Sequence, residues 1–225
     1  MSAGDAAPPP GSRSLRTALL ALIAVGLVLL GGGAAVALGI GRGEATPTAD
    51  SVDAGFARDM GRHHLQGVEM ANLALERSSD PEVRQLAFDI SSTQTNQVGR
   101  MQGWLSLWGL PFSSGATPMA WMDSGAGHGG HDTAGMAGGL MPGMATEEEL
   151  AELRGLSGTA FDVQFLRLMI RHHQGGLEMA QYAADHATVP AVAGLARSIA
   201  ETQTAEVTTM TGMLTARGST PMPAP

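Results

Sequence analysis

Two nearly identical ten-residue segments, each containing adjacent histidines, are the parts of this sequence best suited to chemistry. They are RHHLQGVEMA at residues 62–71 and RHHQGGLEMA at residues 171–180, and together they hold four of the seven histidines in the chain. Each histidine pair also has a methionine three residues before its first member and another seven residues after it. Imidazole nitrogen and thioether sulfur bind soft and borderline metals. Together they favour Cu(I) most, and Cu(II), nickel or zinc less.

The candidate metal ligands occupy matching positions in the two segments. On a helix that turns about 100° per residue, they share one face with Phe, Gly and Ala, whereas Arg58, Arg62 and Glu69 fall on the opposite, solvent-facing side. The candidates are His63, His64, Met60 and Met70 in the first segment, and His172, His173, Met169 and Met179 in the second.

Inward-facing imidazoles need a partner, because an unpaired buried polar group costs about 1–3 kcal/mol. In one hypothesis the histidines and methionines converge on a metal ion, and Gly67 and Gly176 make room for it. In the other, glutamine and threonine on the facing helices satisfy the histidines, and the two glycines only allow close helix packing. Both hypotheses stay open on the sequence alone.

The histidine segments belong to a longer internal repeat. When the chain is shifted by 109 positions, residues 56–108 align with residues 165–217 without a gap, and 23 of the 53 pairs are identical. Each copy is typical of a helical hairpin, with helices expected near 52–78, 81–108, 159–187 and 190–216. Asp80 and Pro81 form a helix start, and Thr159 and Asp162 resemble a capping box. Two such hairpins predict an all-α, ferritin-like four-helix bundle over residues 51–216, since neither hairpin can bury its apolar face alone.

The connection between the copies, residues 111–150, is a second candidate metal-binding segment. It is rich in glycine and predicts one short helix, at ATEEELAEL. It could capture Cu(I) as a flexible segment, or its methionines could simply pack over the end of the bundle. Its candidate ligands are Met119, Met122, His128, His131, Met136, Met141 and Met144.

The N-terminal region predicts a membrane anchor or a signal sequence. Residues 18–40 are apolar and uncharged, and Arg13 and Arg16 precede them, which favours a cytoplasmic N-terminus. The small residues AVA at 35–37 also resemble a signal-peptide cleavage site. Around this segment we expect a disordered tail at 1–17 and a linker at 41–50, with another disordered tail at 217–225. Either interpretation places the bundle outside the cytoplasm, on the cell membrane or secreted.

Composition excludes several classes of function. The chain has no cysteine, so disulfides, thiolate zinc sites and thiol catalysis are excluded. Its net charge of −8 argues against a nucleic-acid partner. A di-iron centre would need inward carboxylates, but Glu69 and Glu178 face outward on the helical wheel. No histidine has a nucleophile paired with it in the sequence, so we expect a binding protein and not an enzyme.

The sequence resembles the bacterial family called domain of unknown function 305. The resemblance rests on FARDMGRHHLQGVEMA (56–71), FDVQFLRLMIRHHQGGLEMA (161–180) and MPGM (141–144), and it covers about residues 51–216. It implies a helical, ferritin-like bundle outside the cytoplasm, and copper as the ligand, since some members are implicated in copper binding and resistance. It also implies the same eight histidines and methionines as ligands. Gln97 departs from the family, whose members often carry Glu there, as this chain does at Glu206.

The expectation from the sequence is therefore a membrane-anchored or secreted protein that binds copper, as Cu(I), for sequestration or transfer. The alternative is a metal-free helical bundle with a structural or protein-interaction role.

Overall fold

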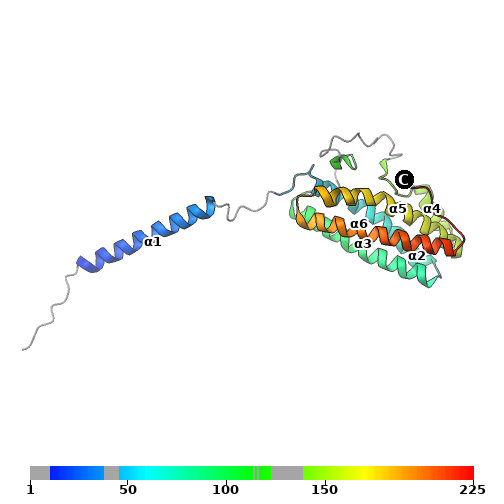
Figure 1. Ribbon diagram of the computed structural model, residues 1–225, viewed down its shortest axis with the longest axis horizontal. Helices are drawn as coiled ribbons and strands as arrows, with labels where there is room; N and C mark the ends of the chain where they lie inside the picture. The colour runs from blue at the N-terminus through cyan, green and yellow to red at the C-terminus, as the bar shows by residue number, and fades with distance from the viewer. Residues whose placement is uncertain (1–10, 38–45, 114, 116, 123–138) are drawn as a thin grey trace, which may run out of the picture. The chain divides into compact units, whose positions relative to one another are not determined.

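Two helical hairpins form the main body of the protein, residues 47–225, and a separate N-terminal unit precedes it. The computed structural model describes residues 11–37, 46–113, 115, 117–122 and 139–225. Within those residues the main body contains four long helices, one short helix and one 3-10 turn (Figure 1). They are α2 (Val52–Arg77), α3 (Pro81–Leu107), η1 (Ala120–Met122), α4 (Glu147–Gly155), α5 (Gly158–His186) and α6 (Pro190–Ala216).

The N-terminal unit contains one helix, α1 (Gly11–Ala37). Its stretch Arg16–Ala34 is long and apolar enough to cross a membrane. This helix fits a membrane anchor or a signal sequence. Residues 1–10 of the expected tail and 38–45 of the expected linker lie outside the described residues.

The predicted four-helix bundle is confirmed, and each long helix agrees with its predicted range to within one residue at either end. Helix α2 packs against α3, α5 packs against α6, and α2 contacts α5 across the middle of the bundle. The two segments with paired histidines lie on α2 and α5. The α2–α5 interface therefore brings them together.

One of the two predicted helix starts is correct. Asp80 caps α3 by accepting from the backbone N–H groups of Glu82 and Val83, with Pro81 at the first helical position. The capping box predicted at Thr159 and Asp162 is wrong, since α5 already begins at Gly158, after Ser157, and has no side-chain cap. A capping box does occur at the start of α4, formed by Thr146 and Glu149.

Helix α6 has an N-terminal cap that comes from the other hairpin. Its own cap residue, Val189, has no side chain that can accept a hydrogen bond. Instead, the buried carboxylate of Asp53 on α2 accepts from Val189 N at 2.9 Å, from Thr188 N at 3.1 Å and from Thr188 Oγ1 at 2.9 Å. Because the cap joins α2 to α6, it stabilises the contact between the hairpins as well as the helix.

We expect Asp53→Ala to lower the free energy of unfolding by about 2 kcal/mol, since it leaves the start of α6 without its acceptor. The matched control is Asp162→Ala, at the equivalent position of the second hairpin, where the buried Oδ1 atom has no hydrogen-bond partner. That control should cost much less or even stabilise the protein. Urea denaturation of both variants measures the difference, and equal losses would contradict the cap.

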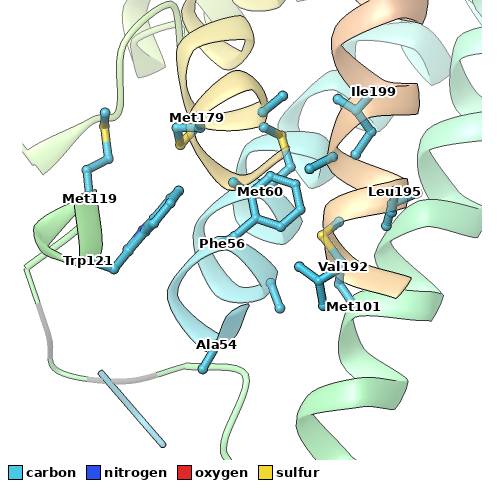
Figure 2. Close-up of a cluster of buried hydrophobic side chains, with 14 of the residues drawn as sticks. Ala54, Phe56, Met60, Met101, Met119, Trp121, Met179, Val192, Leu195 and Ile199 are labelled. Atoms are coloured by element: carbon cyan, nitrogen blue, oxygen red, sulfur yellow. The ribbon is translucent and has the colours of Figure 1, made fainter. Parts of the chain in front are cut away.

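The core divides into two apolar clusters along the bundle. The first apolar cluster, shown in Figure 2, combines side chains from all four long helices with residues of the connection. It includes Phe56, Met60, Met101, Met119, Trp121, Met122, Met141, Met179, Val192, Leu195 and Ile199. The second apolar cluster includes Met70, Ile90, Phe161, Phe165, Met169, Met210 and Leu214.

The described part of the connection is fixed to the bundle through Asp59. The buried carboxylate of Asp59 accepts from Met119 N at 2.7 Å and from Trp121 Nε1 at 2.8 Å. Burial raises the pKa of Asp59, whereas these two hydrogen bonds lower it, and burial has the larger effect. The Trp121 ring lies against Gly55, where a Cβ atom would come within 2.2 Å of it. The 3-10 turn η1 therefore covers the first apolar cluster.

The C-terminal residues, assigned to a disordered tail from the sequence, also contact the bundle. Arg217 pairs with Asp80. Arg167 donates from Nε to the carbonyl of Thr220 at 3.0 Å, and Met222 packs against the second apolar cluster. Part of segment 217–225 is thus bound to the folded domain.

Candidate metal-binding site

The four histidines of the repeated segments form one buried layer in the middle of the bundle. We name His63, His64, His172 and His173 the imidazole layer, and none of the four is exposed to solvent. Along α2 the layer follows Met60 of the first apolar cluster and precedes Met70 of the second, and along α5 the order of the two clusters is reversed. The layer is therefore enclosed between two apolar clusters.

The first histidines of the two pairs stack on each other. The ring centroids of His63 and His172 are 3.8 Å apart, and the ring planes differ by 34°. This close approach depends on two glycines, because a Cβ atom at Gly67 would lie 3.1 Å from Cε1 of His172, and one at Gly176 would lie 3.1 Å from Cε1 of His63. Each ring thus occupies space that the glycine of the other hairpin leaves free.

The Nε2 atom of each imidazole has a hydrogen-bond partner. His64 Nε2 lies 2.7 Å from Oε1 of Gln97, and His173 Nε2 lies 2.6 Å from Oε2 of Glu206. The other two imidazoles contact backbone carbonyls. His63 Nε2 lies 3.1 Å from the carbonyl oxygen of Pro142, and His172 Nε2 lies 2.9 Å from the carbonyl oxygen of His63. Because all four partners are acceptors, the neutral form of each ring carries its proton on Nε2.

The Nδ1 atom of each imidazole is buried and has no hydrogen-bond partner among the described residues. With the proton on Nε2, each Nδ1 presents a lone pair to the interior of the bundle. A metal-binding histidine has this arrangement: one nitrogen donates to a carbonyl, carboxylate or amide oxygen, and the other is free for the metal. The donor set therefore fits a metal ion that prefers imidazole.

The segment 141–145 closes the layer on the side formed by α2 and α5. Its Pro142 carbonyl accepts from His63, and the side-chain amide of Gln66 makes two hydrogen bonds with the backbone of Ala145, at 2.7 and 2.9 Å. A Cβ atom at Gly175 would lie 2.1 Å from Pro142 O. The MPGM sequence thus packs directly on α5 and orients one of the four imidazoles.

Burial keeps three of the imidazoles neutral. Desolvation lowers the pKa of His63 to about 4 and that of His64 to about 3, against 6.5 for the solvated group. Burial also lowers the pKa of His172 well below 6.5. Since only a neutral imidazole can bind a metal, these three rings are in the binding form at and below neutral pH.

The predicted methionine ligands lie on both sides of the imidazole layer, not within it. Met60 and Met179 are in the first apolar cluster, and Met70 and Met169 are in the second; all four are fully buried. In the connection, Met119, Met122 and Met141 are buried in the first cluster, and Met144 packs against it. His128, His131 and Met136 lie outside the described residues.

No three histidine, aspartate or glutamate side chains among the described residues are arranged to hold one metal ion together. Within the described part of the chain, the layer therefore offers a single ion at most two imidazole ligands at once.

Some polar residues lie elsewhere than the helical wheel predicts. Arg58 is not on a solvent-facing side: it is 5% exposed and donates to the carbonyls of Pro111 at 3.1 Å and Ala49 at 2.6 Å. Gln66 and Asp59 hold the connection in place, but the repeated histidine pattern does not point to them. One sequence signal for Asp59 exists, because the aligned position in the second copy, Leu168, is apolar and buried.

A four-helix bundle that buries two pairs of adjacent histidines, one on α2 and one on α5, is the kind of helical domain that this chain forms. The family model described as "Domain of unknown function (DUF305)" matches residues 53–214. The chain belongs to the DUF305 family.

Solved structures with the same fold include family members and a copper-binding protein. A DUF305 protein of Streptomyces coelicolor, described as a candidate secreted protein, is 44% identical, and the match covers 78% of this chain and 99% of that one, with a TM-score of 0.70. A DUF305 fragment from Deinococcus radiodurans is 36% identical, over 74% of this chain and 95% of that one, with a TM-score of 0.57.

The copper-binding protein is CopM in its Cu(I)-bound form, which is 25% identical over 73% of this chain and 96% of CopM, with a TM-score of 0.55. Its Cu(II)-bound form is 27% identical over 71% of this chain and 93% of CopM, with a TM-score of 0.52. No curated protein matches the chain in sequence.

Proposed function

We propose that this protein binds copper, as Cu(I), through the imidazole layer and neighbouring methionines, and that it sequesters or transfers the ion outside the cytoplasm. One observation carries the proposal: four buried imidazoles each have Nε2 hydrogen-bonded to an acceptor and Nδ1 without a partner in the part of the chain that the structure describes. A purely structural core gains nothing from four unpaired buried nitrogen atoms, each of which costs free energy.

The likeness to CopM supports copper as the metal. CopM has the same fold and is known in Cu(I)-bound and Cu(II)-bound forms. Of the metals that bind imidazole, Cu(I) also binds thioether sulfur and accepts low coordination numbers. The methionines in both apolar clusters supply such sulfur within about a helical turn or two of the histidines, because Met60 and Met70 flank His63 along α2.

Sequestration or transfer is favoured over catalysis. The imidazoles lie in the interior, between two apolar clusters, where a substrate would have no room beside the ion. Ligands without thiolate also suit a compartment in which cysteine is oxidised. The apolar helix α1 would hold the domain at the membrane or direct its export.

The test is a competition titration of the purified full-length protein with Cu(I) and a coloured Cu(I) chelator. We expect the wild type to take copper from the chelator, and the variant His63→Ala/His64→Ala/His172→Ala/His173→Ala to lose at least 100-fold in affinity. Replacing the exposed His186 by alanine is the control and should leave the affinity unchanged.

Two results would remove the proposal: no copper binding by the wild type, or unchanged affinity in the fourfold variant. The metal-free alternative predicts a different pattern. In that case the fourfold substitution would change thermal stability only, and copper affinity would stay at background in both proteins.

A further inference from the structure

The buried imidazoles are closed off on most sides of the bundle. The two apolar clusters cover the layer along the bundle axis. Segment 141–145 covers the α2–α5 side, where its backbone contacts Gly175 and His63. Within each hairpin, α2 packs tightly on α3 and α5 on α6. An ion that enters the layer needs a polar route, since crossing an apolar cluster would require it to lose its hydration without compensation.

The side formed by α3 and α6 differs from the others because it is polar. A small cavity of about 10 Å³ lies between these helices, which is on the order of the space that one water molecule needs. Apart from Ile199, its lining consists of hydroxyl, amide and carboxylate side chains. These are Thr93, Gln94 and Gln97 from α3, and Thr202, Gln203 and Glu206 from α6.

Four of these lining residues lead to the four imidazoles. Gln97 and Glu206 accept from Nε2 of His64 and His173. Gln94 lies beside His172 at Gly67, and Gln203 lies beside His63 at Gly176, since a Cβ atom on either glycine would contact both side chains. The cavity is thus one residue away from every ring of the layer.

The two central glutamines also have unused polar atoms. Oε1 of Gln94 and both Oε1 and Nε2 of Gln203 are buried without a hydrogen-bond partner among the described residues. The Glu206 side chain is 19% exposed, so its carboxylate can reach both solvent and His173. A carboxylate at the surface followed by amide oxygens gives a cation successive oxygen partners as it loses water.

We propose that the seam between α3 and α6 is the route by which copper reaches the imidazole layer, with Glu206 as the first contact and Gln94 and Gln203 as later ones. This inference rests on the proposed copper binding. The seam controls the rate of loading and unloading and not the affinity, because the final ligands lie deeper in the bundle.

The repeated Thr-Gln-Thr sequence provides a matched test. The exposed Thr93 and the half-buried Thr202 line the cavity. Thr95 and Thr204, on the other side of the same glutamines, are exposed and do not line it. The variant Thr93→Leu/Thr202→Leu fills the seam with apolar side chains, and Thr95→Leu/Thr204→Leu is the control. Stopped-flow transfer of Cu(I) from a chelator to the full-length protein gives the loading rate, and the competition titration gives the affinity.

We expect Thr93→Leu/Thr202→Leu to load and release copper at least 10-fold more slowly, with its dissociation constant within twofold of wild type. The control should match the wild type in both. A second variant, Thr93→Lys/Thr202→Lys, keeps polar side chains and places positive charge at the seam. It should also slow loading, and added salt should relieve the effect.

Loading rates equal to the control in both seam variants would overturn the inference, and so would a changed affinity with an unchanged rate. If the wild type binds no copper, the proposed function itself fails. This outcome can be told apart from the two above, because those require a wild type that binds copper.

Discussion

Acidification from pH 7 to pH 4.5 is expected to remove most of the stability of the bundle. The pKa of His63 is lowered to about 4 and that of His64 to about 3, and that of His172 is lowered well below 6.5, in each case mainly by burial. In the unfolded chain these groups titrate near 6.5. Between pH 6.5 and about 4, therefore, the unfolded state binds protons that the folded state does not, and stability falls as the pH falls.

The expected size of this effect is large for a domain of this kind. Each such histidine contributes about 1.4 kcal/mol per pH unit once its unfolded form is protonated, so three contribute roughly 4 kcal/mol per unit. That loss over one or two pH units is comparable with the whole stability of a typical domain. The stabilisation by neutral imidazoles is complete above pH 6.5 and lost progressively below it.

Urea denaturation at a series of pH values measures this slope directly. The variant His64→Gln should lower the slope of unfolding free energy against pH by about 1.4 kcal/mol per pH unit. It removes one group that takes up a proton only in the unfolded chain. His186→Gln, at an exposed position, is the control and should keep the wild-type slope. A slope near zero between pH 6.5 and 4.5 in the wild type would show that the imidazoles are hydrated in the folded protein.

Gly175→Ala is expected to destabilise the protein strongly, although it adds only one methyl group. A Cβ atom at this position would lie 2.1 Å from Pro142 O, 2.3 Å from Pro142 C and 2.6 Å from Gly143 N. All three are backbone atoms, so no side-chain rotation can relieve the contact. The substitution must displace segment 141–145, and with it the acceptor of His63 and the two hydrogen bonds of Gln66.

We expect this substitution to lower the free energy of unfolding by about 3 kcal/mol, as overpacking against a rigid neighbour does. Gly194→Ala on α6 is the matched control, because nothing lies within 4 Å of the added methyl group. It should raise the stability by about 0.5–1 kcal/mol through helix propensity alone. Chemical denaturation should show a lower free energy of unfolding for Gly175→Ala and a higher one for Gly194→Ala. A loss below about 1 kcal/mol for Gly175→Ala would contradict the close contact.

The sequence predicted the four long helices and their inward faces well, because both depend on local signals. The 3.6-residue periodicity placed His63 and His64 in the interior, and Asp80 with Pro81 marked the start of α3. The alignment of the two copies also showed which residues occupy equivalent positions. Such features need no knowledge of what lies across the bundle.

Long-range contacts explain what the sequence did not predict. The helical wheel placed Arg58 in solvent, but the carbonyls of Ala49 and Pro111, from segments before α2 and after α3, enclose it. The α6 cap at Asp53 comes from a residue 136 positions before Val189, and no local pattern indicates it. The Nε2 partners of His63 and His172 are backbone carbonyls, which residue types cannot reveal.

At the centre of the bundle, an imidazole of each hairpin packs against a glycine of the other, so the two hairpins depend on each other. His172 fills the space beside Gly67 and donates to the carbonyl of His63, while His63 fills the space beside Gly176. A shortened chain with only one hairpin would expose its polar interior to water and leave a gap where the opposite ring belongs. Its route to a closed fold would be to associate with a second copy of itself, so each hairpin produced separately should be stable only as a dimer.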